Sequence, residues 1–420
     1  MGRHVLAAAI SILLLFFATT SMALAQDITG FEGFRTGEVS LYGYILNYLH
    51  LTEDNIGNVL YFRLKGDWNP GANLSFHMEL SNDYRTGNQH PDYLLTLLGA
   101  PAGETDSRDS ADLTLKIDHL WGLANLGNWD IQFGKIPIGW GTGYAFNPTA
   151  KTHPVSFLDD ISEETPGTLG ILSGYSISNS TALQAYLAFE DKTRTLRPEA
   201  GGWDLIPFGV KVQKIRGAFD FSLSWIREVV YLQEAKEYDQ EYYLGGDFVG
   251  AVGDFSVYGE LALNLPRNED GKFDFSGRRT KDLLEYCVGG DYIFSGKDVT
   301  LRMEYYHQGR GETNKANYNL LKGISAGQEL QAEDYLLVSL ERIFLDYYQL
   351  VIGSLINLND GSLVFMPELT YDAADNLELI LGSAIPYGEG GSEFNGIWEV
   401  NGNKVDLLQP FIYLQVKLSF

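Results

Sequence analysis

Cysteine is almost absent from this chain of 420 residues, in which Cys287 is the only one. A single cysteine excludes an internal disulfide, a cysteine-based zinc cluster and a CxxCH haem-attachment motif. Basic residues are also scarce, with 30 lysines and arginines against 55 acidic residues and a formal charge of −25. Because so acidic a surface repels polyanions, we expect neither nucleic acid nor anionic lipid to be a general partner.

Long hydrophobic runs are missing after residue 25, where no apolar stretch reaches the roughly 18 residues of a membrane-spanning helix. At the N-terminus, Arg3 precedes an apolar run over residues 6–17, and Ala23 and Ala25 form a small-residue cleavage site. This pattern predicts a cleavable signal peptide over residues 1–25. Its removal takes away Arg3 and leaves 29 basic against 55 acidic residues, a formal charge of −26.

Glycine and aromatic residues are abundant instead, with 46 glycines, 25 tyrosines and 23 phenylalanines. Apolar and polar residues alternate with a period of two over stretches such as 74–80, 255–264 and 301–306, which indicates β-strands. A soluble sandwich buries the apolar face of such strands, whereas a transmembrane barrel turns it to lipid and lines its lumen with the polar face. Alternation alone leaves both folds open.

The lengths of the connections distinguish the two folds. We predict about eighteen strands, with short turns after the even-numbered ones and every long connection after an odd-numbered one. Short periplasmic turns alternating with long outer loops are typical of a transmembrane barrel with both ends in the periplasm. The predicted strands are 39–50, 59–67, 74–82, 111–122, 129–138, 168–178, 181–190, 204–215, 218–231, 241–252, 254–265, 282–294, 298–308, 332–344, 347–357, 361–371, 376–387 and 405–420.

The last residues, PFIYLQVKLSF, alternate apolar and polar side chains and end on Phe420. Together with the signal peptide, this ending resembles the C-terminal signature of bacterial outer-membrane β-barrel proteins. The resemblance implies an all-β fold in which residues 26–420 form a single transmembrane antiparallel β-barrel. The strand assignment above gives this barrel about 18 strands, or 16 if two weak strands merge into loops. The resemblance also implies the cell outer membrane of a Gram-negative bacterium, with membrane lipid and lipopolysaccharide as surroundings and a homo-oligomer as one alternative.

A barrel of this size encloses an aqueous channel, so the charges on its inner face matter. Carboxylates lead the basic residues there, and rings of carboxylates in a pore favour cations. The alternative is that these charges solvate the wall and neutralise one another in ion pairs. The period-two pattern predicts as pore-lining residues Glu79, Lys116, Asp118, Asp247, Glu260, Glu285, Asp291, Arg302, Glu304 and Glu368.

The stretch GKIPIGWGTGYAFNPTA, residues 134–150, combines glycines with several large rings where a predicted strand ends. Porins fold one outer loop back into the barrel, and the resemblance suggests this role for residues 139–167. The alternative is that Gly141 and Gly143 permit a turn at the rim and that the rings pack there. The predicted constriction residues are Trp140, Tyr144, Phe146, Asp159, Asp160, Glu163 and Glu164.

The function predicted from these features is a porin for passive diffusion of small hydrophilic solutes, with a mild preference for cations. One alternative is the barrel sheath of a multiprotein conduit that holds a periplasmic multihaem cytochrome. An outer-membrane enzyme is a third hypothesis, but His119, which the alternation turns toward lipid, and His153, on an outer loop, belong to no recognisable triad. We expect no catalytic residues and no cofactor. We also expect no metal site, since the sequence contains no EF-hand loop.

Overall fold

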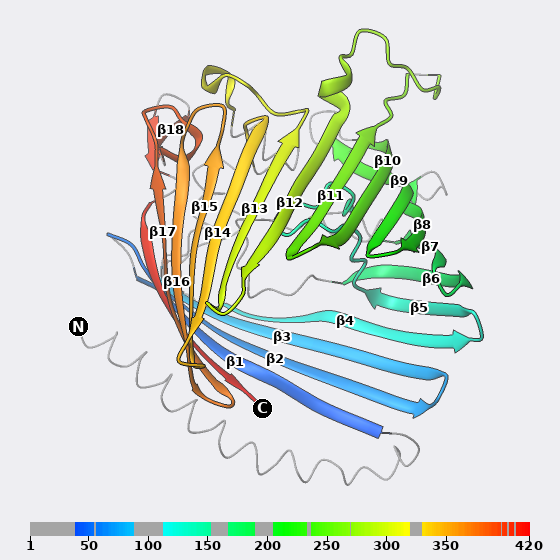
Figure 1. Ribbon diagram of the computed structural model, residues 1–420, viewed down its shortest axis with the longest axis horizontal. Helices are drawn as coiled ribbons and strands as arrows, with labels where there is room; N and C mark the ends of the chain where they lie inside the picture. The colour runs from blue at the N-terminus through cyan, green and yellow to red at the C-terminus, as the bar shows by residue number, and fades with distance from the viewer. Residues whose placement is uncertain are drawn as a thin grey trace.

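The computed structural model describes residues 38–53, 56–87, 112–152, 167–189, 205–232, 237–268, 270–319, 330–395, 397–400, 403–406 and 409–420. Within these ranges the chain forms an eighteen-stranded sheet and a separate two-stranded hairpin (Figure 1). The predicted signal peptide, residues 1–25, lies outside the described residues.

The elements have the following bounds. The wall strands are β1 (Glu38–Leu51), β2 (Ile56–Gly71), β3 (Leu74–Gly87), β4 (Asp112–Leu126), β5 (Trp129–Ile136), β6 (Thr168–Ser178), β7 (Thr181–Ala188), β8 (Phe208–Arg216), β9 (Phe219–Leu232), β10 (Glu237–Val252), β11 (Phe255–Asn264), β12 (Leu284–Phe294), β13 (Val299–Gln308), β14 (Asp334–Phe344), β15 (Tyr348–Asn357), β16 (Leu363–Ala374), β17 (Leu377–Tyr387) and β20 (Phe411–Ser419). The hairpin consists of β18 (Ile397–Val400) and β19 (Asn403–Asp406), and the 3-10 turns are η4 (Thr280–Leu283), η5 (Lys315–Asn317) and η6 (Glu393–Asn395). Among the described residues, no helix is long and apolar enough to cross a membrane.

The first and last strands close the barrel. β20 pairs antiparallel with β17 on one side and with β1 on the other, where Tyr44 lies opposite Ser419. Gly43 and Phe420 exchange two backbone hydrogen bonds of 2.9 Å at this seam. Each wall strand therefore has a partner on both sides, so the barrel has no open edge. The predicted all-β antiparallel barrel of about 18 strands is confirmed.

The strand boundaries also reproduce the predicted alternation of connections. Every even-numbered strand from β2 to β16 is followed by a turn of at most four residues, and the long connections follow odd-numbered strands. The largest difference is at the start of the last strand, which the prediction places at residue 405. Residues 403–406 instead pair with 397–400 in the β18–β19 hairpin, and β20 starts only at Phe411.

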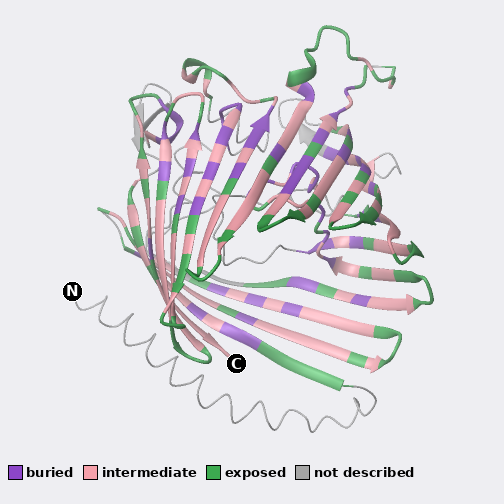
Figure 2. Cartoon of the chain, viewed as in Figure 1, coloured by how far each residue is buried: buried purple, intermediate pink, exposed green. Residues whose placement is uncertain are grey.

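The wall is polar inside and apolar outside. More buried and less buried positions alternate over parts of several strands, such as β8 and β14 (Figure 2). Buried residues on β2 and β3 include the charged Arg63 and Glu79, the latter 4% exposed, whereas Leu115 on β4 is 72% exposed. Soluble proteins show the opposite distribution, because lysine, glutamate, arginine and aspartate are seldom buried in them. The outer face is therefore suited to lipid and the inner face to water.

β4 carries a β-bulge opposite β3. Glu79 pairs with His119 and Leu80 pairs with Ile117, so Asp118 is one residue in excess. Such a bulge shifts the alternation of side chains by one residue, and Asp118 and His119 are both buried inside the barrel. The prediction that His119 faces lipid is therefore wrong, because it assumed an unbroken period of two along β4.

Apolar packing also occurs inside the barrel. Residues 137–152, here called the inward segment, follow β5 and contribute to two buried clusters. One cluster joins Ile138 and Trp140 to side chains of β7, β9, β10 and β11. The other joins Ala145 and Phe146 to side chains of β12–β16 and of the connections after β13 and β17. The inward segment is thereby packed against a large part of the inner wall.

Candidate functional site

The inward segment enters the lumen because β5 ends early, at Ile136. Beyond that point the backbone N–H of Gly167, next to β6, donates to the carbonyl oxygen of Asp118 on β4 at 3.1 Å. Gly167 therefore satisfies a backbone acceptor that a longer β5 would have paired. Residues 137–152 are therefore free to leave the plane of the wall.

Glu260 on β11 binds the two ends of the inward segment's turn. Its carboxylate accepts the backbone N–H groups of Thr142 at 2.8 Å, Gly143 at 3.4 Å and Thr149. The hydroxyl of Thr149 donates to the same carboxylate at 2.7 Å. Hydrogen bonds to an ionised acceptor are stronger than neutral ones, so this buried side chain fixes the segment against β11.

Glu304 on β13 binds the middle of the same turn. Its carboxylate accepts the backbone N–H groups of Tyr144 at 2.6 Å, Ala145 at 3.2 Å and Phe146 at 2.8 Å. The hydroxyl of Tyr258 donates to it at 2.7 Å. Glu304 is 0% exposed, so four donors surround a carboxylate that has no contact with water. Consecutive backbone N–H groups converging on an anion form a concave anion site of the nest type.

Two glycines make this close approach possible. Gly141 has a φ of 107°, and a Cβ there would lie 2.5 Å from Oδ1 of Asn147 and 2.8 Å from Oε2 of Glu260. At Gly143, a Cβ would overlap the carbonyl oxygen of Phe146. Any side chain at either position would therefore push the turn away from its carboxylate. This explains why glycines lie between the large rings in this stretch.

The ring of Phe146 lies flat on that of Tyr306 of β13, with 4.2 Å between centroids and 4° between planes. Beneath it, the thiol of Cys287 on β12 donates to the carbonyl oxygen of Phe146 at 3.1 Å, and Cys287 is fully buried. Lys151, near the end of the inward segment, forms an ion pair of 2.5 Å with Glu285 on β12. The sole cysteine of the chain is thus covered by the inward segment.

The predicted constriction residues have different surroundings. Tyr144 is 51% exposed, and the guanidinium of Arg302 lies 3.7 Å from its ring centroid. Phe146 and Trp140 are buried, the latter against Tyr186 with 4.8 Å between ring centroids. Of the three rings, only Tyr144 is exposed to the lumen. Asp159, Asp160, Glu163 and Glu164 lie outside the described residues.

The ten residues predicted to line the pore all lie on wall strands, but their side chains have different partners. Glu260, Glu285 and Glu304 contact the inward segment, and Glu260 and Glu304 are covered by it, so these two do not line open lumen. Asp291 pairs with Arg302 at 2.7 Å, and Lys116 pairs with Asp83 at 3.6 Å. Asp247 accepts from Ser222, and Glu368 accepts from Tyr413. Glu79 and Asp118 join the network described next.

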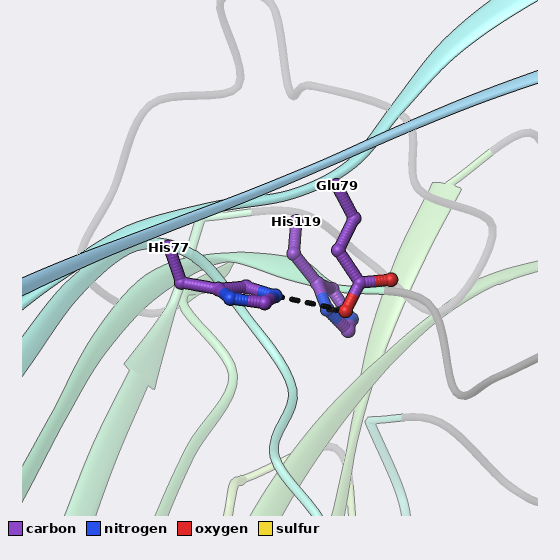
Figure 3. A group of neighbouring side chains, drawn as sticks. All are labelled: His77, Glu79 and His119. Carbon is purple, nitrogen blue, oxygen red and sulfur yellow. Dashed lines mark hydrogen bonds and ion pairs between the residues drawn. The ribbon is translucent and has the colours of Figure 1, made fainter. Parts of the chain in front are cut away.

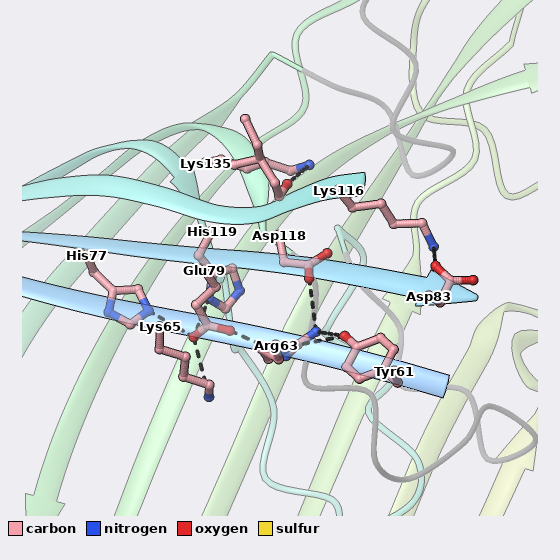
Figure 4. Close-up of polar contacts among 11 residues, drawn as sticks. Tyr61, Arg63, Lys65, His77, Glu79, Asp83, Lys116, Asp118, His119 and Lys135 are labelled. Carbon is pink, nitrogen blue, oxygen red and sulfur yellow. Dashed lines mark hydrogen bonds and ion pairs between the residues drawn. The ribbon is translucent and has the colours of Figure 1, made fainter. Parts of the chain in front are cut away.

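A second group of charges lies on β2, β3 and β4 (Figure 4). Arg63 donates to Glu79 at 3.3 Å and to Asp118 at 3.0 Å, and its Nη2 also donates to the hydroxyl of Tyr61 at 2.6 Å. Lys65 lies 3.6 Å from Glu79. One buried arginine thus joins carboxylates on two strands, and the bulge supplies Asp118 as the second of them.

A third group lies in the connection after β17. Glu393 accepts hydrogen bonds from the backbone N–H of Gln331 at 2.7 Å, the hydroxyl of Tyr335 at 2.6 Å and the amide of Asn357 at 2.7 Å. Burial, assisted by the nearby Asp360 carboxylate, raises the pKa of Glu393 to about 7 despite these donors. This carboxyl group thus joins the long connections after β13 and β17.

Several residues of these groups were not singled out from the sequence. Thr149, Tyr258 and Tyr306 bind the inward segment or its carboxylates, and His77 lies between Asp67 and Glu79. The period-two pattern places Tyr258, Tyr306 and His77 on the inner face of their strands. No local sequence pattern predicts which inner residues contact a segment that lies 100 or more positions away in the chain.

No family model matches the sequence, and no curated protein matches it. Among solved structures, the chain is similar to the outer-membrane protein OmpT of Vibrio cholerae in its trimer form, with 10% identity and a TM-score of 0.40 over 92% of this chain and 100% of that chain. It is similar to the outer-membrane channel DcaP of Acinetobacter baumannii, with 14% identity and a TM-score of 0.45 over 93% and 99%. A mutant of the Rh. blastica porin has 12% identity and a TM-score of 0.44 over 91% and 100%.

In fold, the chain is a porin-like β-barrel. The antiparallel pairing of its neighbouring strands and the closure of β20 against β1 define this fold.

Proposed function

We propose that the barrel spans an outer membrane and acts as a passive channel for small hydrophilic solutes. The observation that carries this proposal is the inverted wall, with charged side chains buried inside and leucine, valine and phenylalanine exposed outside. A barrel of sixteen to eighteen strands is wide enough for an aqueous channel. The inward segment narrows that channel from within.

The proposed selectivity is a mild preference for cations. Many inner carboxylates are neutralised, since Glu79, Asp118 and Asp291 have arginine partners and Glu304 is covered by backbone N–H groups. The excess of acidic over basic residues over the whole chain still favours cations at the channel entrances. We therefore expect a modest shift of reversal potential in a salt gradient, smaller than a simple count of inner carboxylates would suggest.

Planar-bilayer recording of the purified protein tests the channel. Stepwise, ohmic conductance in KCl is the expected result, with a reversal potential in a tenfold gradient whose sign reports cation preference. A protein that is folded, as shown by a heat-dependent shift on a denaturing gel, yet passes no current would refute the channel. A reversal potential of the opposite sign would refute only the selectivity.

Tyr144 provides a sharper test of the narrowing. Because its side chain, which belongs to the inward segment, is half exposed, Tyr144→Ala is expected to raise the single-channel conductance. The matched control is Tyr347→Ala, since Tyr347 is 61% exposed in the short turn after β14, far along the chain from the inward segment. Equal conductance in both variants and the wild type would contradict a constriction at Tyr144.

We further propose that residues 1–25 are removed as a signal peptide during export. Mass spectrometry of the exported protein should give an N-terminus at Gln26 if residues 1–25 are removed. The inward segment occupies lumen that a cytochrome inside the barrel would need, which disfavours the conduit alternative. Haem absorbance in the protein purified from native membranes would nevertheless support that alternative over a simple channel.

A further inference from the structure

Two histidines and a glutamate converge on the inner face of β3 and β4 (Figure 3). Nε2 of His77 lies 2.8 Å from Oε1 of Glu79, and Nδ1 of His119 lies 3.1 Å from the same oxygen. The three ligand atoms all lie within 4.8 Å of one another. All three side chains are largely buried, in the half of the barrel nearer the short turns.

The bulge in β4 creates this convergence. Without it, an unbroken period of two would place His119 on the outward face with Ile117, which is 47% exposed. The extra residue Asp118 instead turns His119 inward, directly opposite Glu79. Bulges often redirect a side chain toward a functional site.

The surroundings of the trio resemble the outer shell of a metal site. Nδ1 of His77 lies 2.7 Å from a carboxylate oxygen of Asp67, on the side of the ring away from Glu79. Metal-binding histidines usually direct their second nitrogen to a carboxylate or carbonyl in this way. Arg63 donates to the other oxygen of Glu79 at 3.3 Å, which orients the carboxylate with Oε1 toward both imidazoles.

We propose that His77, Glu79 and His119 bind a divalent transition-metal ion of the Zn²⁺ class from the channel lumen. Two imidazoles and one carboxylate suit Zn²⁺, Ni²⁺ or Cu²⁺, whereas Ca²⁺ and Mg²⁺ prefer oxygen ligands. Ligands at zinc distances of about 2.0–2.2 Å in a tetrahedron lie roughly 3.3 Å apart. The observed contacts to Oε1, 2.8 and 3.1 Å, need to open by only a few tenths of an ångström.

Together with Arg63, which binds the other oxygen of Glu79, Lys65 opposes an ion at this place. Its Nζ lies 3.6 Å from Oε1 of Glu79 and is 14% exposed as a side chain, so it neutralises the carboxylate when no ion is bound. An incoming cation must displace it. Lys65→Gln is therefore expected to tighten metal binding. If His77, Glu79 and His119 had a purely structural role, this substitution would not be expected to increase metal affinity.

The test is calorimetric titration of the folded full-length barrel in detergent with Zn²⁺. We expect one ion per barrel, unaffected by excess Ca²⁺ or Mg²⁺. His77→Asn and His119→Asn should abolish this binding, and Asp67→Asn should weaken it about tenfold to a hundredfold. The matched control is His307→Asn, because His307 also lies beside a carboxylate, 2.8 Å from Asp334, and should leave binding unchanged.

Fluorescence gives an independent readout if a histidine variant fails to fold. The ring of Trp121 stacks on that of His77 with 5.0 Å between centroids, so Cu²⁺ bound at His77 should quench Trp121 strongly. Trp121→Phe should remove that quenching without removing calorimetric binding. Absence of stoichiometric Zn²⁺ binding by the wild type, or equal loss in His307→Asn, would overturn the proposal, whether or not the barrel conducts.

Discussion

Replacing Glu304 with glutamine is expected to loosen the inward segment. The glutamate accepts three backbone N–H groups and the hydroxyl of Tyr258 without contact to water. A glutamine keeps one acceptor oxygen, but its NH₂ group must face at least one of these donors. Losing one charge-assisted hydrogen bond and weakening the others costs about 2–4 kcal/mol in the closed position of the segment.

Cys287 reports this opening directly, because the inward segment covers its thiol. If the segment opens and closes quickly, a water-soluble maleimide reacts in proportion to the fraction that is open. A loss of about 2–4 kcal/mol therefore raises the labelling rate of Glu304→Gln by about 30- to 1000-fold over the wild type. The rate is measured from the mass shift of the folded protein in detergent.

Two further variants test whether the labelling rate of Cys287 follows the number and charge of the hydrogen bonds to the inward segment. Tyr258→Phe removes one neutral donor and keeps the carboxylate, so labelling should rise only by about fivefold, for a loss near 1 kcal/mol. Glu368→Gln alters another inner-wall glutamate, which binds Tyr413 on β20, and should leave labelling unchanged. A Glu304→Gln rate within threefold of the wild type would show that this carboxylate does not hold the segment.

Three other perturbations follow from the same structure. Gly141→Ala should destabilise the inward segment by more than 1 kcal/mol, since it combines a positive φ with overlap on Glu260, and faster thiol labelling checks this. Arg63→Met leaves two buried carboxylates without their arginine and should lower the free energy of unfolding from vesicles by about 3–5 kcal/mol. Because the pKa of Glu393 rises from an ordinary value of 4.5 to about 7 on folding, its stabilising contribution is full below pH 4.5 and falls as the pH rises to 7. The free energy of unfolding, obtained from urea titrations across that range, should therefore decline more steeply for the wild type than for Glu393→Gln, by up to about 3 kcal/mol in total.

The barrel itself was predictable because closure imposes simple rules on the sequence. Each strand must alternate its side chains, and both ends must lie on the side of the short turns. These rules place β1 to β17 within a few residues of their observed bounds. The beginning of β20 was misplaced because the β18–β19 hairpin uses residues that also suit a strand.

The functional groups were predictable only in part. The alternation of side chains correctly predicts that Glu260 and Glu304 point inward. It does not predict which inner carboxylate a distant segment of the chain will cover. His119 was placed on the wrong face because a bulge depends on the pairing with β3, which no local pattern encodes. Gly141 and Gly143 indicate an unusual turn in the sequence. Only the contacts with Glu260 in the structure explain why this turn lies inside the barrel.

The bulge in β4 also has a genetic consequence. The two halves of the strand each keep a regular alternation and differ in phase by the single residue Asp118. Deleting that codon restores one phase throughout, with Ile117 still outward and His119 still inward. An in-frame deletion inside a membrane strand normally turns half of its side chains to the wrong face, whereas this one should leave the barrel closed and remove only one carboxylate partner of Arg63.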